Sequence, residues 1–139
     1  MMLTLGLMAL AAMPQTANAP TAPKTEANAA HDTKVVGAAR NWLALVDDGR
    51  WDESYRATGE SFRKLNTAAV WASVSEKVRA PLGTVVSRTF VSQQNLPAPP
   101  AGYEVVKFQT RYANKANAVK TISLDREGGA WRVVGVTIE

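Results

Sequence analysis

The spacing of the apolar residues changes once along this chain, at Gly83, and this change limits the folds that the chain can adopt. Before Gly83 the apolar residues recur every three or four positions, as they do on one face of a helix. After Gly83 apolar and polar residues alternate and β-branched residues become frequent, as in a strand. Helices that come first and strands that follow predict an α+β domain.

Three helices are expected before Gly83. Each has apolar residues at spacings of three and four, and each is followed by a glycine or a proline, which end helices. The first two expected helices lie between Asp32 and Gly49 and from Arg50 to Thr58. The third is expected to begin either at Glu60 or at Ala68, with Thr67 as N-cap, and to end before Pro81.

Four antiparallel strands are expected after Gly83, joined as a meander on which the three helices pack. A proline-rich segment cannot enter a central ladder, and the pair Gly128-Gly129 accepts positive φ, so both are connections. The expected strands begin at Val85 and then span Tyr103 to Ala113, Ala118 to Asp125 and Trp131 to Ile138; the connections are Leu96 to Gly102, Asn114 to Asn117 and Glu127 to Gly129. In the second strand, Val106, Phe108 and Tyr112 are expected on one face and Lys107, Gln109 and Arg111 on the other.

The last expected strand has apolar residues on both faces. Trp131 and Val133 are predicted to point one way, and Val134, Val136 and Ile138 the other. A sheet that is apolar on both faces needs two covers, and the helices supply one. A second copy of the chain is a candidate for the other, which predicts a possible homodimer through the sheet; the alternative is that Trp131 packs at a sheet edge.

The N-terminus indicates an exported protein. Residues 1–19 have no charge and begin with an apolar run of 13 residues, whereas the rest of the chain holds all 16 Lys and Arg and all 12 Asp and Glu. Residues 1–19 are interpreted as a signal peptide cleaved near Ala19, residues 20–30 as a flexible leader, and residues 31–139 as one domain. We expect a periplasmic or secreted protein without a membrane anchor in its mature form, because the apolar run is too short to span a bilayer. The alternative is a buried N-terminal helix.

Composition excludes several classes of site. The chain has no cysteine and one histidine, His31, so disulfides, thiolate metal sites and a histidine metal cluster are excluded. No phosphate-binding or dinucleotide-binding motif is present, and neither a metal nor another cofactor is expected. The net charge of +4 is spread among charges of both signs, so no nucleic-acid partner is expected.

Five residues are candidates for a ligand pocket. Tyrosines could offer a hydroxyl group, and an arginine at the mouth of a pocket could hold a carboxylate or phosphate. Packing or salt bridges are the alternative roles of all five. The candidates are Tyr55, Arg79, Arg88, Arg111 and Tyr112.

No residue is assigned as catalytic. Four aspartates were considered as acids or bases, and each has a simpler interpretation as a turn, cap or exposed residue. They are Asp47 and Asp48 in a solvated turn, Asp52 in a helix cap and Asp125 near the last hairpin.

The order of the elements resembles the nuclear transport factor 2-like superfamily, in which a bent sheet and helices form a cone. The chain also resembles, from Val35 to Ile138, the bacterial family called domain of unknown function 4019. The resemblance implies a curved four-stranded sheet and an exported protein, and it supplies no catalytic residue. The similar blocks are Trp42 to Gly49, Arg79 to Gly83, Ser87-Arg88, Phe108 to Lys115 and Gly129 to Val133.

Two functional hypotheses follow. The first is a non-enzymatic module that binds an unknown small molecule or an envelope protein through the cone or the outer sheet face. The alternative is an enzyme of the ketosteroid isomerase or dehydratase type, with acid and base groups in the cone. A buried carboxyl group in a deep pocket would favour the enzyme, and a pocket filled by Trp42, Trp71, Phe108 and Trp131 would exclude it and point to a protein partner.

Overall fold

The computed structural model describes residues 33–98 and 102–139. The predicted signal peptide, the predicted leader and His31 lie outside these residues, as does part of the proline-rich connection.

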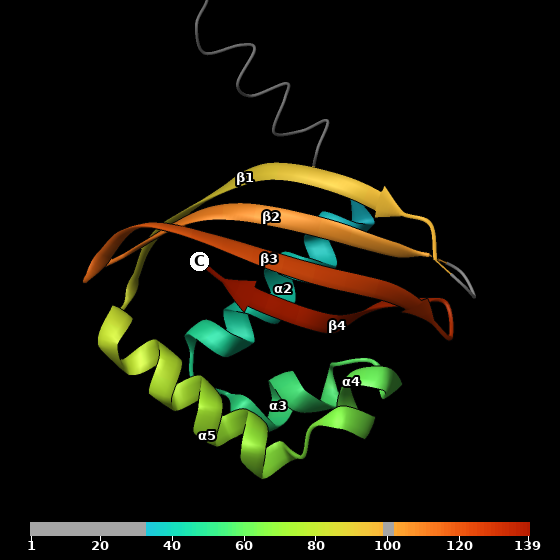
Figure 1. Ribbon diagram of the computed structural model, residues 1–139, viewed down its shortest axis with the longest axis horizontal. Helices are drawn as coiled ribbons and strands as arrows, with labels where there is room; N and C mark the ends of the chain where they lie inside the picture. Colours follow the sequence, from blue (N-terminus) through green and yellow to red (C-terminus); the bar gives the residue numbers. More distant parts are fainter. Residues whose placement is uncertain (1–32, 99–101) are drawn as a thin grey trace, which may run out of the picture.

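Helices precede strands, and the prediction of an α+β fold with a four-stranded antiparallel sheet is confirmed (Figure 1). The strands follow the order β1-β2-β3-β4, so each strand pairs with its neighbour in the sequence. In the described residues the elements are α2 (Lys34–Asp47), α3 (Trp51–Arg56), α4 (Glu60–Leu65), α5 (Ala68–Arg79), the 3₁₀ turn η1 (Ala80–Leu82), β1 (Val85–Leu96), β2 (Tyr103–Tyr112), β3 (Lys115–Glu127) and β4 (Ala130–Ile138).

One expected alternative is confirmed and one boundary was wrong. The third helix, α5, begins at Ala68 with Thr67 as N-cap, and residues from Glu60 form a separate helix, α4, because Asn66 takes an extended conformation between them. Thr67 then caps α5, and its Oγ1 accepts a hydrogen bond from the Val70 N–H at 3.1 Å. The turn before β3 contains Ala113 and Asn114 alone, so β3 begins at Lys115, three residues earlier than expected.

The helices cover one face of a curved sheet (Figure 1). Helix α2 lies against the inner face of the sheet, and its buried side chains form one core with those of β2, β3 and β4. The alternation expected in β2 is observed: Val106, Phe108 and Tyr112 are buried, whereas Lys107, Gln109 and Arg111 are exposed on the outer face. In β3 the inward positions are Ala118, Lys120, Ile122 and Leu124.

A β-bulge changes the faces of β4. Leu124 pairs with Val133, but Ser123 pairs with Gly135, so Val134 is an extra residue in β4. Because the bulge reverses the alternation, Val133 and Val136 both pack on the core. The expectation that Val133 and Val136 point to opposite faces was therefore wrong. Val136, which was expected to make the second face of β4 apolar, lies on the core side instead. The homodimer through the sheet stays a prediction.

Gly59 lets the start of α4 lie against β4. Its N–H donates to the carbonyl oxygen of Val133 at 2.8 Å. A Cβ atom at position 59 would lie 2.7 Å from Val134 Cγ1 and 3.0 Å from Glu127 Oε2, which is closer than real Cβ contacts. The absence of a side chain is thus required by packing, since the φ of Gly59 is −77°.

Gly59→Ala is expected to lower the free energy of unfolding by about 1–3 kcal/mol, because the added methyl group displaces Val134 and the Glu127 carboxylate. Gly37→Ala is the matched control. Gly37 lies within α2 with nothing within 4 Å of the new Cβ, so this variant should be more stable by about 0.5–1 kcal/mol. Urea unfolding followed by circular dichroism measures both. Equal shifts in the same direction would contradict the packing argument.

Candidate functional site

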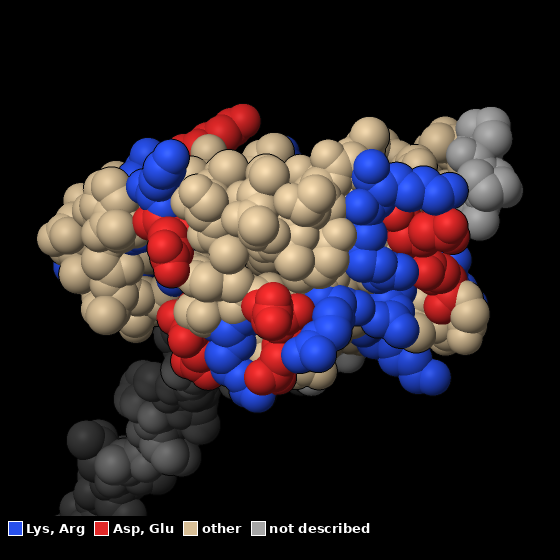
Figure 2. Space-filling model, turned by 90° about the horizontal axis from the view of Figure 1, so that it is seen from below, with Lys and Arg blue, Asp and Glu red and all other residues tan. Residues whose placement is uncertain are grey.

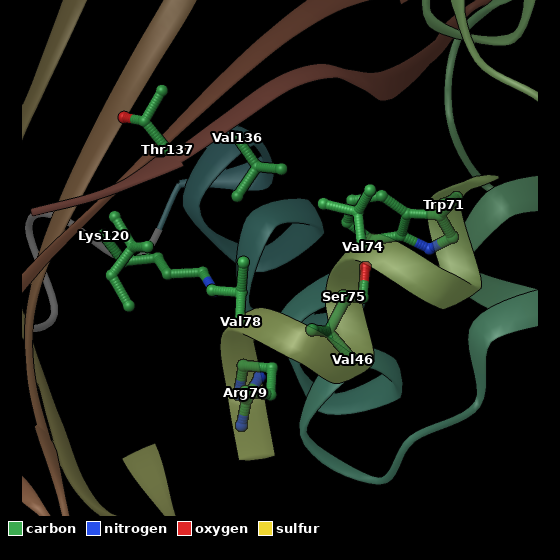
Figure 3. Close-up of a pocket in the computed structure, with 10 residues that line it drawn as sticks. Val46, Trp71, Val74, Ser75, Val78, Arg79, Lys120, Val136 and Thr137 are labelled. Carbon is green, nitrogen blue, oxygen red and sulfur yellow. The ribbon is translucent and has the colours of Figure 1, made fainter. Parts of the chain in front are cut away.

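A small cleft opens between α5 and the end of β4, and we call it the Lys120 cleft (Figure 3). Its volume is about 130 Å³. Most of its walls are apolar, and Ser75, Arg79, Lys120 and Thr137 are the lining residues with a hydroxyl or cationic side chain. The lining residues are Val46, Trp71, Val74, Ser75, Val78, Arg79, Lys120, Val136, Thr137 and Ile138.

The surface around the cleft is also apolar. Val70, Val74 and Val78 follow one another at intervals of four along α5, and all three are exposed. The helix side of the molecule shows a broad area without charged side chains (Figure 2). An apolar ligand that enters the Lys120 cleft would therefore meet valine side chains at its mouth.

Lys120 is a buried cation in this apolar setting. It occupies an inward position of β3, is only 4% exposed, and its side chain extends across the cleft toward α5 (Figure 3). Among the described residues its side chain has no hydrogen bond or ion pair. Burial, and then the guanidinium groups of Arg79 and Arg88, lower the pKa of Lys120 from 10.5 to about 8.

Asp47 joins two arginines beside the cleft. Its Oδ2 accepts a hydrogen bond from Arg88 Nη1 at 2.7 Å, and its Oδ1 accepts one from Arg88 Nη2 at 3.2 Å. Arg79 Nη1 lies 3.0 Å from Asp47 Oδ1, as an ion pair that is not aligned for a hydrogen bond. The arginine side chains are 11% and 12% exposed and that of Asp47 is 21% exposed, so solvent screens these charges weakly.

Several donors near the cleft have no acceptor in the described part of the chain. Nε and Nη1 of Arg79 have no hydrogen-bond partner, and neither has the hydroxyl group of Ser75. The Arg79 guanidinium lies over the Tyr112 ring, 5.1 Å from its centroid. Burial raises the pKa of Tyr112 in spite of the nearby arginines, so its hydroxyl group stays protonated at neutral pH.

We refer to Arg79, Arg88, Lys120 and Asp47 together as the cationic cluster. It contains three cationic side chains and one carboxylate, which is already occupied by the two arginines. A buried excess of positive charge is unfavourable unless an anion compensates for it. The cluster is therefore suited to bind an anionic group.

The structure brings together three of the five residues predicted for a pocket. Arg79, Arg88 and Tyr112 gather at the cationic cluster. Arg111 lies exposed on the outer face of the sheet, opposite the helices. Tyr55 lies in α3, where its hydroxyl group donates to the carbonyl oxygen of Asn66 at 2.7 Å.

Sequence reasoning missed the roles of Asp47 and Lys120. It interpreted Asp47 as part of a solvated turn, and the structure instead pairs it with two arginines distant in sequence. A signal for Lys120 was present, since Lys120 is the one charged residue among the inward positions Ala118, Ile122 and Leu124. A lysine at an inward strand position predicts a buried cation.

The other aspartates lie elsewhere. Asp52 is in the first turn of α3. Burial, and then the charge of Glu127, raise the pKa of Asp125, which lies near Gly59 and not among the residues of the Lys120 cleft. In residues 33–98 and 102–139, no three histidine or carboxylate side chains gather in a way that could hold a metal ion. No helix in the same ranges is long and apolar enough to cross a membrane.

The fold and the site define an α+β domain with a cationic cleft between a helix and a curved antiparallel sheet. The chain belongs to the family described as protein of unknown function (DUF4019), whose model matches residues 38–136. All members of the cationic cluster lie within the matched range. A comparison with curated proteins gives no match.

Asp47→Asn is expected to lower the free energy of unfolding by about 2–4 kcal/mol, because it leaves two poorly solvated guanidinium groups without a counter-charge. Asp48→Asn, at the exposed neighbouring residue, should change it by less than about 0.5 kcal/mol. Chemical denaturation of both variants at low salt gives the comparison. An equal loss of unfolding free energy in both variants would show that the ion pairs of Asp47 do not stabilise the fold.

Lys120→Met is expected to raise the free energy of unfolding at pH 7, by about 1–3 kcal/mol, because it removes a buried, unpaired charge and keeps the volume. The pKa of Lys120 is lower in the folded than in the unfolded chain, so the unfolded chain binds the proton more tightly. The stability of the natural protein should therefore rise with pH between about 8 and 10.5, and the advantage of the variant should shrink over the same range.

The measurement is urea unfolding of both proteins from pH 7 to 10.5. Lys107→Met, on the exposed outer face of β2, is the control and should follow the natural protein at every pH. A constant difference between Lys120→Met and the natural protein would contradict the lowered pKa.

Proposed function

We propose that this protein is a binding module that holds a small amphipathic anion in the Lys120 cleft. The single observation that supports this most strongly is Lys120 itself, a 4% exposed cation that has no hydrogen bond or ion pair with the described residues and that extends into a cleft. Such a group lowers the stability of the fold, and groups that do so in a cleft are typical of functional sites. An anion would supply the missing partner.

The dimensions of the cleft define the apolar part of the ligand. An apolar cavity of about 150 Å³ holds one benzene molecule, so a cleft of about 130 Å³ fits a branched chain or ring of about six carbons. Val74, Val78 and Val136 would contact that part. Lys120 and Arg79 would hold the anionic group, which could be a carboxylate.

The rest of the interior supports binding over acid and base catalysis. Trp42 and Phe108 are part of the core, and Trp71 and Trp131 pack against it. In the part of the chain that the structure describes, the Lys120 cleft is lined by neither aspartate nor glutamate. Asp47 is paired with two arginines and is not among the residues that line the cleft.

Two further proposals concern the fold family and the location. The helices on the concave face of a curved meander support membership of the nuclear transport factor 2-like superfamily (Figure 1). The uncharged segment over residues 1–19 supports export to the periplasm or the medium, with cleavage near Ala19. An exported module of this kind would meet its small ligand, or an envelope protein, outside the cytoplasm.

A pair of isosteric compounds tests the proposed function. Isothermal titration of the natural protein should show that 4-methylpentanoate binds at least about tenfold more tightly than 4-methylpentanamide, because only the acid can compensate for the excess positive charge. Lys120→Met should weaken binding of the acid by about tenfold or more, and Lys107→Met should not. Equal binding of acid and amide would overturn the proposal.

A further inference from the structure

We propose that the Lys120 amine condenses reversibly with the carbonyl group of a small oxo acid, so that the site captures its ligand as an imine. The ligand class is a 2-oxo acid with a short branched or cyclic apolar side chain. This inference rests on the proposed function, because the same cleft must first admit the anion.

The position of the amine favours it as a nucleophile. The Lys120 side chain is almost fully buried, points into the cleft and is engaged by no acceptor in the described ranges. An amine with this freedom can direct its lone pair at a bound carbonyl carbon. Desolvated lysines next to other cations are the usual form of a Schiff-base lysine.

Burial and the neighbouring charges keep a useful share of the amine neutral. Burial, and then Arg79 from α5 and Arg88 from β1, disfavour the ammonium form, and Asp47 from α2 favours it more weakly. With its pKa at about 8, half of the Lys120 amine is neutral at that pH. An exposed lysine with an ordinary pKa near 10.4 is neutral to less than about 1% at the same pH.

Arg79 would orient the oxo acid. It lines the same cleft, and its Nε has no hydrogen-bond partner in the described residues. A guanidinium stays protonated and cannot act as the nucleophile, so the two cations have separate tasks. Arg79 holds the carboxylate, and Lys120 attacks the adjacent carbonyl carbon.

The step balances without an oxidant or a reductant. The neutral amine forms a bond to the carbonyl carbon, and the π electrons of the carbonyl group move to its oxygen. A proton passes from nitrogen to that oxygen and gives a carbinolamine. The hydroxyl group then leaves with a second proton as water, and a carbon–nitrogen double bond remains. Apolar walls from Val74, Val78 and Val136 limit the water that would reverse the reaction.

The experiment is reductive trapping on the full chain. The protein is incubated with 4-methyl-2-oxopentanoate and sodium cyanoborohydride, and the modified lysines are located by peptide mass mapping. We expect the adduct on Lys120 to form at least tenfold faster than on any of the exposed lysines 34, 64, 77, 107 and 115, with a rate that rises with pH and levels off above about 8.

Two variants and one ligand make the result decisive. Lys120→Arg keeps a cation but cannot form an imine, so trapping at the cleft should be lost. In Lys107→Arg the adduct on Lys120 should form at the same rate as in the natural protein. Binding of 4-methylpentanoate to the natural protein without selective trapping at Lys120 would overturn the imine alone. Failure of both acids to bind would overturn the proposed function and the imine with it.

Discussion

The bridge that Asp47 forms between two arginines is the interaction on which the interior of this protein depends. Asp47 ends α2, Arg79 ends α5, and Arg88 lies on β1, so one carboxylate connects three elements, of which α2 is remote in sequence from the other two. The carboxylate and both guanidinium groups are largely removed from water, which makes the loss of any one of them costly. The bridge holds the end of α5 to α2 and β1, and Arg79 at that end also lines the Lys120 cleft.

The cationic cluster has more positive charge than its fold requires. The single negative charge of Asp47 compensates for one of the three positive charges, and the other two have no carboxylate partner in the cluster. A methionine at position 120 would fill the same space without a charge. A buried cation at this position is expected to lower the stability of the fold, and this supports the proposal that the site binds an anion.

The sheet contributes its own constraint through the bulge in β4. The extra residue, Val134, turns Val136 and Ile138 toward the helices, so they form the wall of the cleft that faces α5. Without the bulge these side chains would lie on the outer face, and the cleft would lose its apolar side. The start of α4 packs on the same region of β4 through Gly59, which fixes the strand on its other side.

Local sequence determined the elements of this protein. The change of period at Gly83 predicted helices followed by strands, Thr67 predicted a start for α5, and the Gly128-Gly129 pair predicted the last hairpin. These features could be predicted because each signal acts over a few residues. Only the tertiary structure decided the site. The partners Asp47 and Arg88 are 41 residues apart, and the bulge that redirects β4 depends on its pairing with β3. The alternation of β3 held a signal that Lys120 is buried, but this signal was not used in the prediction. The lack of a partner for its side chain follows from how α2, α5 and the sheet pack together, which no local pattern specifies.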